Sequence, residues 1–180
     1  GYCTMKAGGR AGAVAVASGR AELAELIGWL EQQGVRWRVI GRGSNILVRD
    51  QGYDGVLVVL GGDFCSIDPA PPTVSDRDVT VVRFGTGCSV AKCIGWSVQQ
   101  SLTGLEFMAG IPGSIGGAVL MNAGAWGHEI GDIVETVFFV DRNGLYHAVP
   151  VSDLEFSYRR MEPKDRLLKG AVVVGAVVAL

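Results

Sequence analysis

The residues Gly-Arg-Gly-Ser-Asn at positions 41–45 are suited to holding an anion. Glycine lets the backbone turn so that successive N–H groups point at one acceptor and form a nest. Ser44 and Asn45 can add hydrogen bonds from their side chains. The stretch lacks the third glycine and the following helix of a dinucleotide fingerprint, and the chain has no Gly-Lys-Ser/Thr phosphate loop. Taken alone, the pattern is more typical of a tight polar turn between strands.

A second stretch, GIPGSIGGAVLMNAGAWG at 110–127, contains six glycines in eighteen residues. Four of them surround Pro112, so the backbone can turn sharply and present N–H groups without obstruction by a Cβ. A series of small residues lets a flat ring or a pyrophosphate lie against the main chain, and Asn122 can donate or accept at a heterocycle edge. A glycine-rich crossover packed between two sheets is the alternative, but packing alone does not require so many glycines beside a proline.

The segment FSYRR at 156–160 supplies the third group of candidate residues. Tyr158 and Arg159 are suited to a clamp for an anion or an enolate. The alternative is that the arginines are ordinary solvated surface residues. His128 and His147 lack the spacing of a metal or triad site and are interpreted as structural.

Composition limits the classes of partner. With 27 glycines in 180 residues, glycine reaches 27/180 = 15%, about twice the usual ~7%. The net charge of −2 gives no basic field, so nucleic acid is not expected as a main partner. No apolar run approaches the roughly 20 residues that span a bilayer, so no membrane association is expected. The four cysteines form no C-x-x-C pair, which argues against a metal site and favours a reducing cytoplasm.

The elements that must position these residues are expected in two α+β lobes. In the first lobe, 1–63, apolar spacing predicts a helix over 16–35, capped by Ser18 and ended by Gly34, and strands at 37–40, 45–48 and 55–60 in a βαββ-type unit.

The second lobe is expected over 64–180. A seam at 66–78 with one strand is followed by a strand at 79–87 and a helix at 89–102 that packs Val90, Cys93, Ile94 and Val98. A hairpin at 134–150, a polar irregular segment and an apolar strand at 170–180 complete it. Because the sequence stops within this apolar strand, more chain is expected to follow.

Four stretches in this order resemble one family: YCTMKAGGRA, GRGSNILV, EFMAGIPGSIGGAVLMNAGAWGHEI and FSYRR. They are similar to the flavin-binding part of the UDP-N-acetylenolpyruvoylglucosamine reductase (UDP-N-acetylmuramate dehydrogenase) family. The resemblance implies a PCMH-type FAD-binding fold of two α+β lobes with the flavin between them.

The resemblance also implies which positions hold the cofactor. Both glycine-rich stretches would wrap FAD, and the absence of a histidine at Ser44 and Asn45 implies noncovalent binding. The implied pyrophosphate-side residues are Gly43, Ser44 and Asn45, with Gly41 beside them as a further cofactor residue. The implied flavin-side residues are Gly110, Ile111, Pro112, Gly113, Ser114, Ile115, Gly116, Gly117, Ala118, Asn122, Ala123, Gly124 and Ala125.

The family's reaction is an NADPH-dependent reduction of the enolpyruvyl group of a UDP-sugar in cytoplasmic peptidoglycan synthesis. Arg159 matches the arginine that polarises the enolpyruvyl carboxylate, with Tyr158 beside it on the substrate, while Met161 stands where a serine is usual. The family's proton-donating serine and assisting glutamate belong to a substrate domain outside these residues. The chain is therefore expected to bind FAD without turning over the substrate.

Two other interpretations stay open at this point. The chain resembles, more loosely, the FAD subunit of other PCMH-type oxidoreductases, such as molybdenum hydroxylases or α-hydroxy acid oxidases. It is also compatible with a glycine-rich interaction domain that binds no cofactor. The oligomeric state is left open.

Overall fold

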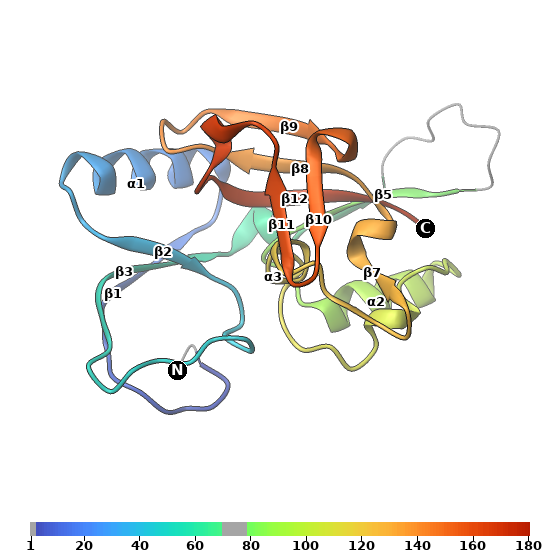
Figure 1. The fold of residues 1–180 in the computed structure, drawn as a ribbon, viewed down its shortest axis with the longest axis horizontal. Helices are drawn as coiled ribbons and strands as arrows, with labels where there is room; N and C mark the ends of the chain where they lie inside the picture. The colour runs from blue at the N-terminus through green and yellow to red at the C-terminus, as the bar shows by residue number, and fades with distance from the viewer. Residues whose placement is uncertain (1–2, 70–78) are drawn as a thin grey trace.

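The computed structural model describes residues 3–69 and 79–180 (Figure 1). Its first part has the element order β1 (Ala11–Ala17), α1 (Arg20–Gln32), β2 (Trp37–Ile40) and β3 (Tyr53–Leu60). The three strands form a sheet of order β1-β3-β2 in which both outer strands run parallel to β3. The observed order is βαββ, but its first strand is β1, which was not predicted, and the predicted strand at 45–48 is absent.

The second part is built on a five-stranded antiparallel sheet. Its strands are β4 (Ile67–Pro69), β5 (Val81–Gly85), β8 (Val134–Val140), β9 (Tyr146–Pro150) and β12 (Val172–Ala179), in the order β4-β5-β12-β8-β9. The apolar run predicted at 170–180 is its central strand, paired with β5 and β8. The hairpin predicted at 134–150 is also confirmed.

Helix α1 is amphipathic and packs between the two sheets. Leu23, Ile27 and Leu30 are fully buried at the i, i+4, i+7 spacing of one helix face. They share a core cluster with Val58 of β3 and Val172 of β12. The helix therefore joins the two parts through one hydrophobic core rather than covering a single sheet.

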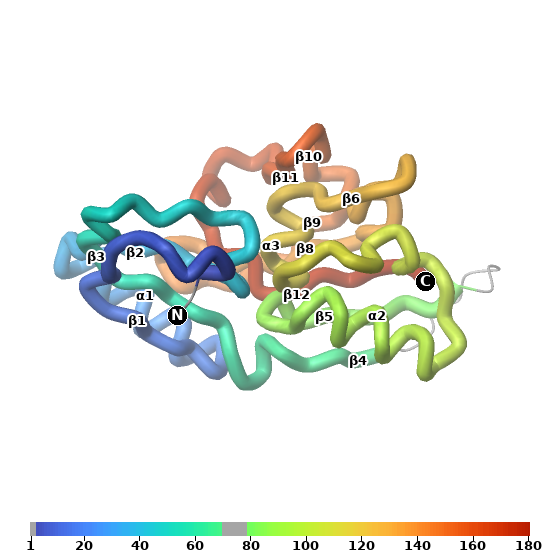
Figure 2. Tube along the Cα trace, turned by 90° about the horizontal axis from the view of Figure 1, so that it is seen from below, coloured from blue at the N-terminus to red at the C-terminus, as the bar shows by residue number. Residues whose placement is uncertain are grey.

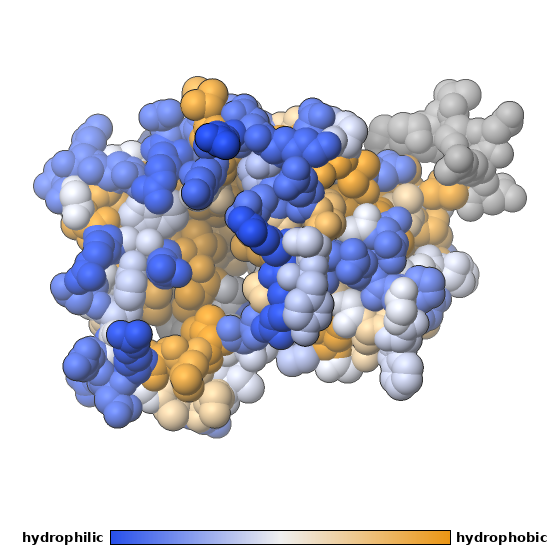
Figure 3. Space-filling view, in the orientation of Figure 1, coloured by the Kyte–Doolittle hydropathy of each residue, from blue (hydrophilic) through white to orange (hydrophobic). Residues whose placement is uncertain are grey.

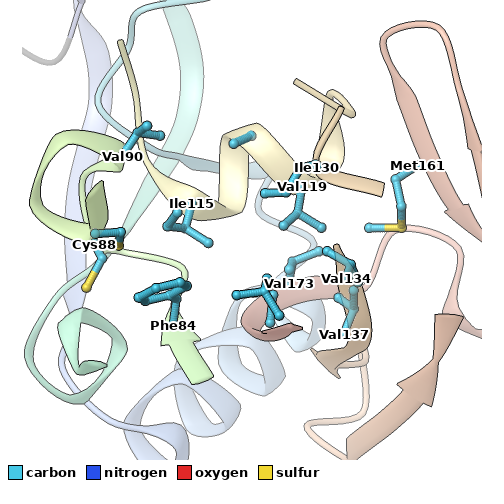
Figure 4. Packing of buried hydrophobic residues seen from close by; sticks show 14 of the residues in the cluster. Phe84, Cys88, Val90, Ile115, Val119, Ile130, Val134, Val137, Met161 and Val173 are labelled. Carbon is cyan, nitrogen blue, oxygen red and sulfur yellow. The ribbon is translucent and has the colours of Figure 1, made fainter. Parts of the chain in front are cut away.

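The opposite face of the five-stranded sheet is covered by α2 (Val90–Gln99) and α3 (Ile115–Leu120). Ile115 and Val119 of α3 point down toward Phe84 and Val173 of the sheet (Figure 4). Side chains alternate across a strand, so Val172 faces the α1 cluster while Val173 faces the α3 cluster. Helix α3 lies at the junction of the two parts in both ribbon and tube views (Figures 1 and 2).

Two small hairpins lie beside α3. One pairs β6 (Gly124–Ala125) with β7 (His128–Glu129), and the other pairs β10 (Leu154–Ser157) with β11 (Arg160–Pro163). The remaining elements are 3-10 turns, η1 (Gly62–Cys65), η2 (Glu106–Met108), η3 (Ile130–Asp132), η4 (Val151–Asp153) and η5 (Arg166–Leu168).

Several sequence-based predictions were wrong in detail. Residues 45–48 form no strand, and the segment after Val151 is an ordered hairpin rather than irregular chain. Strand β1 and helix α3 were missed because their alanines and glycines carry no strand or helix pattern. Helix α1 begins after Gly19 rather than Ser18. In α2, Val98 is 69% exposed, while Ser97 faces the core and donates to the Cys93 carbonyl at 3.0 Å.

The structure also bears on the predicted lobe boundary, on the predicted seam and on membrane-spanning helices. The predicted boundary at 63 and 64 falls inside η1, and the lobe limits stay a prediction. Part of the predicted seam, 70–78, lies outside the described residues. Nowhere in residues 3–69 or 79–180 is a helix long and apolar enough to cross a membrane.

Candidate cofactor-binding groove

A groove of about 1600 Å³ lies between the three-stranded sheet and α3. One side consists of β2 and the loop that follows it, and the other of residues 111–125, the β10–β11 turn and the start of β12. Figure 3 shows apolar surface inside the hollow between the two parts of the molecule. The volume exceeds the roughly 300–1,000 Å³ of sites for drug-sized ligands, so an extended ligand can be held.

The two glycine-rich stretches meet in this groove. Ser44 Oγ donates a hydrogen bond of 3.0 Å to the Pro112 carbonyl oxygen. A Cβ on Gly41 would lie 2.3 Å from Ser114 Oγ, and a Cβ on Gly113, whose φ is +135°, would lie 3.0 Å from Ser44 Oγ. A side chain at Gly41 would displace the Ser114 hydroxyl, and one at Gly113 would crowd the Ser44 hydroxyl and be strained at positive φ, so the glycines keep both hydroxyls in place.

Several backbone donors at this meeting point have no protein acceptor. Among the described residues, the N–H groups of Gly43, Ser44 and Asn45 find no hydrogen-bond partner, and neither do those of Gly113 and Ser114. All five residues line the groove. Gly43 and Ser114 are buried and Ser44 and Gly113 are half-buried, whereas Asn45 is exposed. Since buried or half-buried backbone donors are normally paired, these groups are suited to an anion such as a pyrophosphate.

The charge of the groove agrees with an anionic ligand. Arg38, Arg42, Arg142 and Arg159 line it, whereas Glu129 and Asp132 are the carboxylates of the described lining. Opposite charge raises the local concentration of an anion and favours its binding. The arginines outnumber the carboxylates, so the described lining has a net positive charge that favours a phosphate.

The turn of the β10–β11 hairpin carries Tyr158 and Arg159 into the groove. Arg159 adopts a left-handed conformation with φ of +58°, and its Nη2 donates to Asn45 Oδ1 at 3.0 Å. Tyr158 is 90% exposed. The two predicted substrate residues thus sit next to each other, and Arg159 is oriented by a residue of the first glycine-rich stretch.

The Asn122 amide makes hydrogen bonds within the protein, whereas the sequence suggested an amide that contacts a heterocycle. Its side chain is buried; Nδ2 donates to the Ser157 carbonyl at 3.2 Å, and Oδ1 accepts from the Gly131 N–H at 3.1 Å. It therefore holds the hairpin that carries Arg159. Its backbone borders the groove, and contact of its amide with a cofactor stays a prediction.

Most of the predicted cofactor residues line the groove, but two do not. Ile115 is 1% exposed in the core under α3, and Gly110 is exposed outside the lining. Gly116 serves packing as well, since a Cβ there would lie 2.8 Å from Thr86 Cβ. Thr86 in turn donates to the Val173 carbonyl at 2.9 Å, which fixes β5 to β12 beneath the helix.

Sequence reasoning missed part of the lining. Trp37, Arg38 and Val39 of β2, Arg142 of the β8–β9 turn and Gly170–Val173 all border the groove. The position of β2, directly before the first glycine-rich stretch, was the available signal for its residues; Arg142 and Gly170 reach the groove only through tertiary packing. His128, interpreted as structural, also lines the groove, with its side chain 68% exposed.

The cysteines lie outside the groove. Cys88 and Cys93 are buried, as expected for packing residues. A hydrogen bond from Cys93 lowers the pKa of the Cys88 thiol to about 7, against the opposing effect of burial. The same hydrogen bond, together with burial, raises the pKa of Cys93. No cluster of three or more metal-ligating side chains occurs in the described part of the chain.

Comparison with known proteins agrees with this geometry. A family model described as FAD binding domain matches residues 11–149. The reductase named UDP-N-acetylenolpyruvoylglucosamine reductase from Heliobacterium modesticaldum is 39% identical over 158 residues, covering 88% of this chain and 48% of the relative. The protein of the same name from Limosilactobacillus fermentum is 36% identical over 179 residues, covering 99% and 56%. The chain spans about half the length of these relatives.

Solved structures show the same fold. UDP-N-acetylenolpyruvylglucosamine reductase from Thermus caldophilus matches 92% of this chain and 54% of its own, with a TM-score of 0.73 and 28% identity. A solvent-stable cholesterol oxidase matches 92% of this chain and 34% of its own, with a TM-score of 0.62 and 14% identity, which shows fold alone.

The α+β, PCMH-type FAD-binding fold expected from the sequence is thereby confirmed. The matched residues contain both glycine-rich stretches and most of the groove lining, whereas Tyr158, Arg159 and Gly170–Val173 of the lining lie beyond residue 149. The chain belongs to the FAD binding domain family and corresponds to the FAD-binding portion of UDP-N-acetylenolpyruvoylglucosamine reductases.

Proposed function

We propose that this chain binds FAD noncovalently in the groove and forms the FAD-binding portion of an NADPH-dependent oxidoreductase. The substrate of that enzyme is UDP-N-acetylglucosamine enolpyruvate, and its product, UDP-N-acetylmuramate, serves cytoplasmic peptidoglycan synthesis. The observation that carries the proposal is the meeting of two glycine-rich loops, where five backbone N–H groups have no acceptor among residues 3–69 and 79–180.

The residues present fit the cofactor. The unpaired N–H groups of Gly43–Asn45, Gly113 and Ser114 suit the pyrophosphate, because its charged oxygens accept hydrogen bonds from closely spaced backbone donors. The small residues Gly117, Ala118 and Ala123–Ala125 offer main chain to the flat isoalloxazine ring. Neither Ser44 nor Asn45 can form the histidyl bond of covalent flavoproteins.

When bound, FAD supplies hydride transfer between NADPH and the enolpyruvyl double bond. The chain's own contribution is to orient and to stabilise charge. Arg159, held by Asn45 Oδ1, presents its guanidinium to the enolpyruvyl carboxylate and stabilises the negative charge that develops there. Tyr158 stands exposed beside it as a second donor to the substrate.

The proposal assigns the proton donor to residues outside this chain. Reduction of the double bond requires a proton at carbon, which the family resemblance assigns to a serine assisted by a glutamate. The chain spans about half of its relatives' length. We therefore expect the 180-residue chain to bind FAD and to show no sustained, substrate-dependent NADPH consumption.

The test is a visible absorbance spectrum of the purified chain followed by a flavin fluorescence titration with FAD. We expect a flavin band, saturation at one FAD per chain, and complete release of flavin into the supernatant on acid precipitation. A cooperatively folded protein that binds no added FAD would overturn the proposal, and flavin that stays with the acid precipitate would overturn its noncovalent part.

A further inference from the structure

The turn of the β8–β9 hairpin reaches from the five-stranded sheet to α1 and β2. Arg142 in this turn forms an ion pair with Glu31 of α1, and its guanidinium carbon lies 5.5 Å from the centroid of the Trp37 ring. Glu31 Oε1 also accepts a hydrogen bond of 2.9 Å from Trp37 Nε1. One carboxylate therefore holds an indole and a guanidinium together across the two sheets.

The position of this turn is fixed from several sides. A Cβ on Gly144 would lie 3.0 Å from Ala24 Cβ of α1, and a Cβ on Gly170 would lie 3.3 Å from Arg142 Nη2. The Asp141 carboxylate accepts the N–H groups of Asn143 and Leu145 and lies 2.9 Å from His147 Nε2. Arg142 is thus held in place although its side chain is 56% exposed.

Arg142 and Trp37 line the groove, and so does Arg159. Trp37 begins β2 and Gly41 follows it, so the strand separates them by about 13 Å at a rise of about 3.3 Å per residue. The loop of residues 41–45 then leads to Asn45, the partner of Arg159. In Figure 1 the β8–β9 turn lies beside α1, away from the β10–β11 turn. Along the chain, the N–H groups of this loop therefore follow Trp37, which Arg142 contacts, and lead to Asn45, which Arg159 contacts.

We infer that Arg142, held by Glu31 and Trp37, closes the groove over the adenosine half of FAD and is a specificity-determining residue for FAD over FMN. The inference rests on the proposed function, which sets the pyrophosphate beside Gly43–Asn45 and the isoalloxazine toward Arg159. The adenosine must then extend toward Trp37.

The chemistry of this end suits a nucleoside. Guanidinium has five N–H donors, and Glu31 occupies only part of them; the others can donate to purine ring nitrogens or ribose hydroxyls. Val39, which is half-buried and lines the groove two residues after Trp37, provides apolar surface for a purine face. Pairing with Glu31 offsets the positive charge of Arg142, so this end favours an uncharged nucleoside over a second phosphate.

The experiment compares FAD with FMN, which carries the flavin and one phosphate but no adenosine. The 180-residue chain and its Arg142→Met variant are titrated with each cofactor by flavin fluorescence. We expect Arg142→Met to raise the Kd for FAD about tenfold and the Kd for FMN less than twofold. The matched control is Arg36→Met, which removes an exposed ion pair with Asp54 outside the groove and should change neither Kd.

Each other outcome has a defined meaning. Equal weakening of both cofactors would show that Arg142 only ties the sheets together, and an unchanged Kd for FAD would show no role; both results overturn the inference. If Arg142→Met does not melt cooperatively, Glu31→Gln replaces it, with an expected loss of at least threefold in FAD-over-FMN preference. Wild type that binds both flavins equally overturns the inference alone, whereas wild type that binds neither overturns the proposed function.

Discussion

Ser44 and Pro112, 68 residues apart in the chain, are joined by a hydrogen bond of 3.0 Å from the Ser44 hydroxyl to the Pro112 carbonyl oxygen. The bond sets the distance between the two glycine-rich loops, and the unpaired backbone donors lie on both sides of it. The hydroxyl therefore fixes the relative position of the backbone donors that we propose bind the pyrophosphate.

Ser44→Ala removes this link without adding bulk. We expect the Kd for FAD to rise about fivefold, because one intramolecular hydrogen bond contributes about 1 kcal/mol. The measurement is a flavin fluorescence titration. Ser152→Ala, which removes a hydroxyl beside the exposed Asp153, serves as the control and should leave the Kd unchanged. An equal Kd for wild type and Ser44→Ala would contradict this role.

Gly41→Ala and Gly28→Ala form a matched pair of glycine substitutions. At Gly41 a Cβ would meet Ser114 Oγ at 2.3 Å and displace this hydroxyl where the two loops meet, so we expect FAD affinity to fall about tenfold. At Gly28, within α1, nothing lies within 4 Å of the added Cβ. That variant should raise Tm by about 2–4 °C through better helix propensity, with FAD affinity unchanged. A Gly41→Ala chain that binds FAD like wild type would show that the loops have room to spare.

Asn122 is expected to be a stability residue. Asn122→Gly keeps the left-handed backbone, φ of +43°, but deletes both side-chain hydrogen bonds and removes the acceptor of the half-buried Gly131 N–H. We expect a loss of about 1–3 kcal/mol in urea unfolding. Asn122→Ala should lose more, because alanine is strained at positive φ. If alanine proves the milder substitution, backbone strain does not act at this position.

Asp141 is expected to make stability depend on pH in the acid range. Burial opposes ionisation, but hydrogen bonds from His147, Leu145 and Asn143 outweigh it and lower the pKa of Asp141. Because the folded pKa lies below the unfolded one, the stabilisation is present above the unfolded pKa of about 3.9 and is lost as pH falls through the folded value. Urea unfolding between pH 2 and pH 6 should show a flatter acid slope for Asp141→Asn than for wild type; parallel slopes would refute this assignment.

We expect the reactivity of the four thiols to depend on their exposure to a reagent rather than on their pKa. Although the pKa of Cys88 is lowered to about 7, Cys88 and Cys93 are buried, whereas Cys3 and Cys65 are partly exposed. A thiolate must be reached by reagent to react. An aromatic disulfide reagent should therefore modify two thiols quickly and the other two only in denaturant. Rapid modification of all four thiols in the native protein would show that the core around Cys88 opens readily.

The sequence alone located the groove's two loops but not its full wall. Clusters of glycine are a local requirement for close backbone approach, so residues 41–45 and 110–125 could be recognised without a fold. Arg142 and Trp37 could not, because their proximity depends on how the β8–β9 turn packs on α1.

The errors in the predicted elements have physical causes as well. Asn45–Val48 have strand-forming side chains, but tertiary contacts hold this segment as an extended loop, with Ser44 tied to Pro112 and the Ile46 carbonyl accepting from Cys3 Sγ. The hairpin at Tyr158 and Arg159 looked irregular because its strands are short and polar; it is held by pairing between Phe156 and Met161 and by the buried Asn122.

Strand β12 gives the molecule a particular order of assembly. It is the central strand of the five-stranded sheet, yet the other four strands of that sheet all precede it in the chain. Until β12 inserts between β5 and β8, Val172 cannot complete the cluster beneath α1, nor Val173 the cluster beneath α3. During synthesis both hydrophobic cores therefore remain incomplete until residues 172–179 have been made. A cofactor can bind only after that strand has left the ribosome.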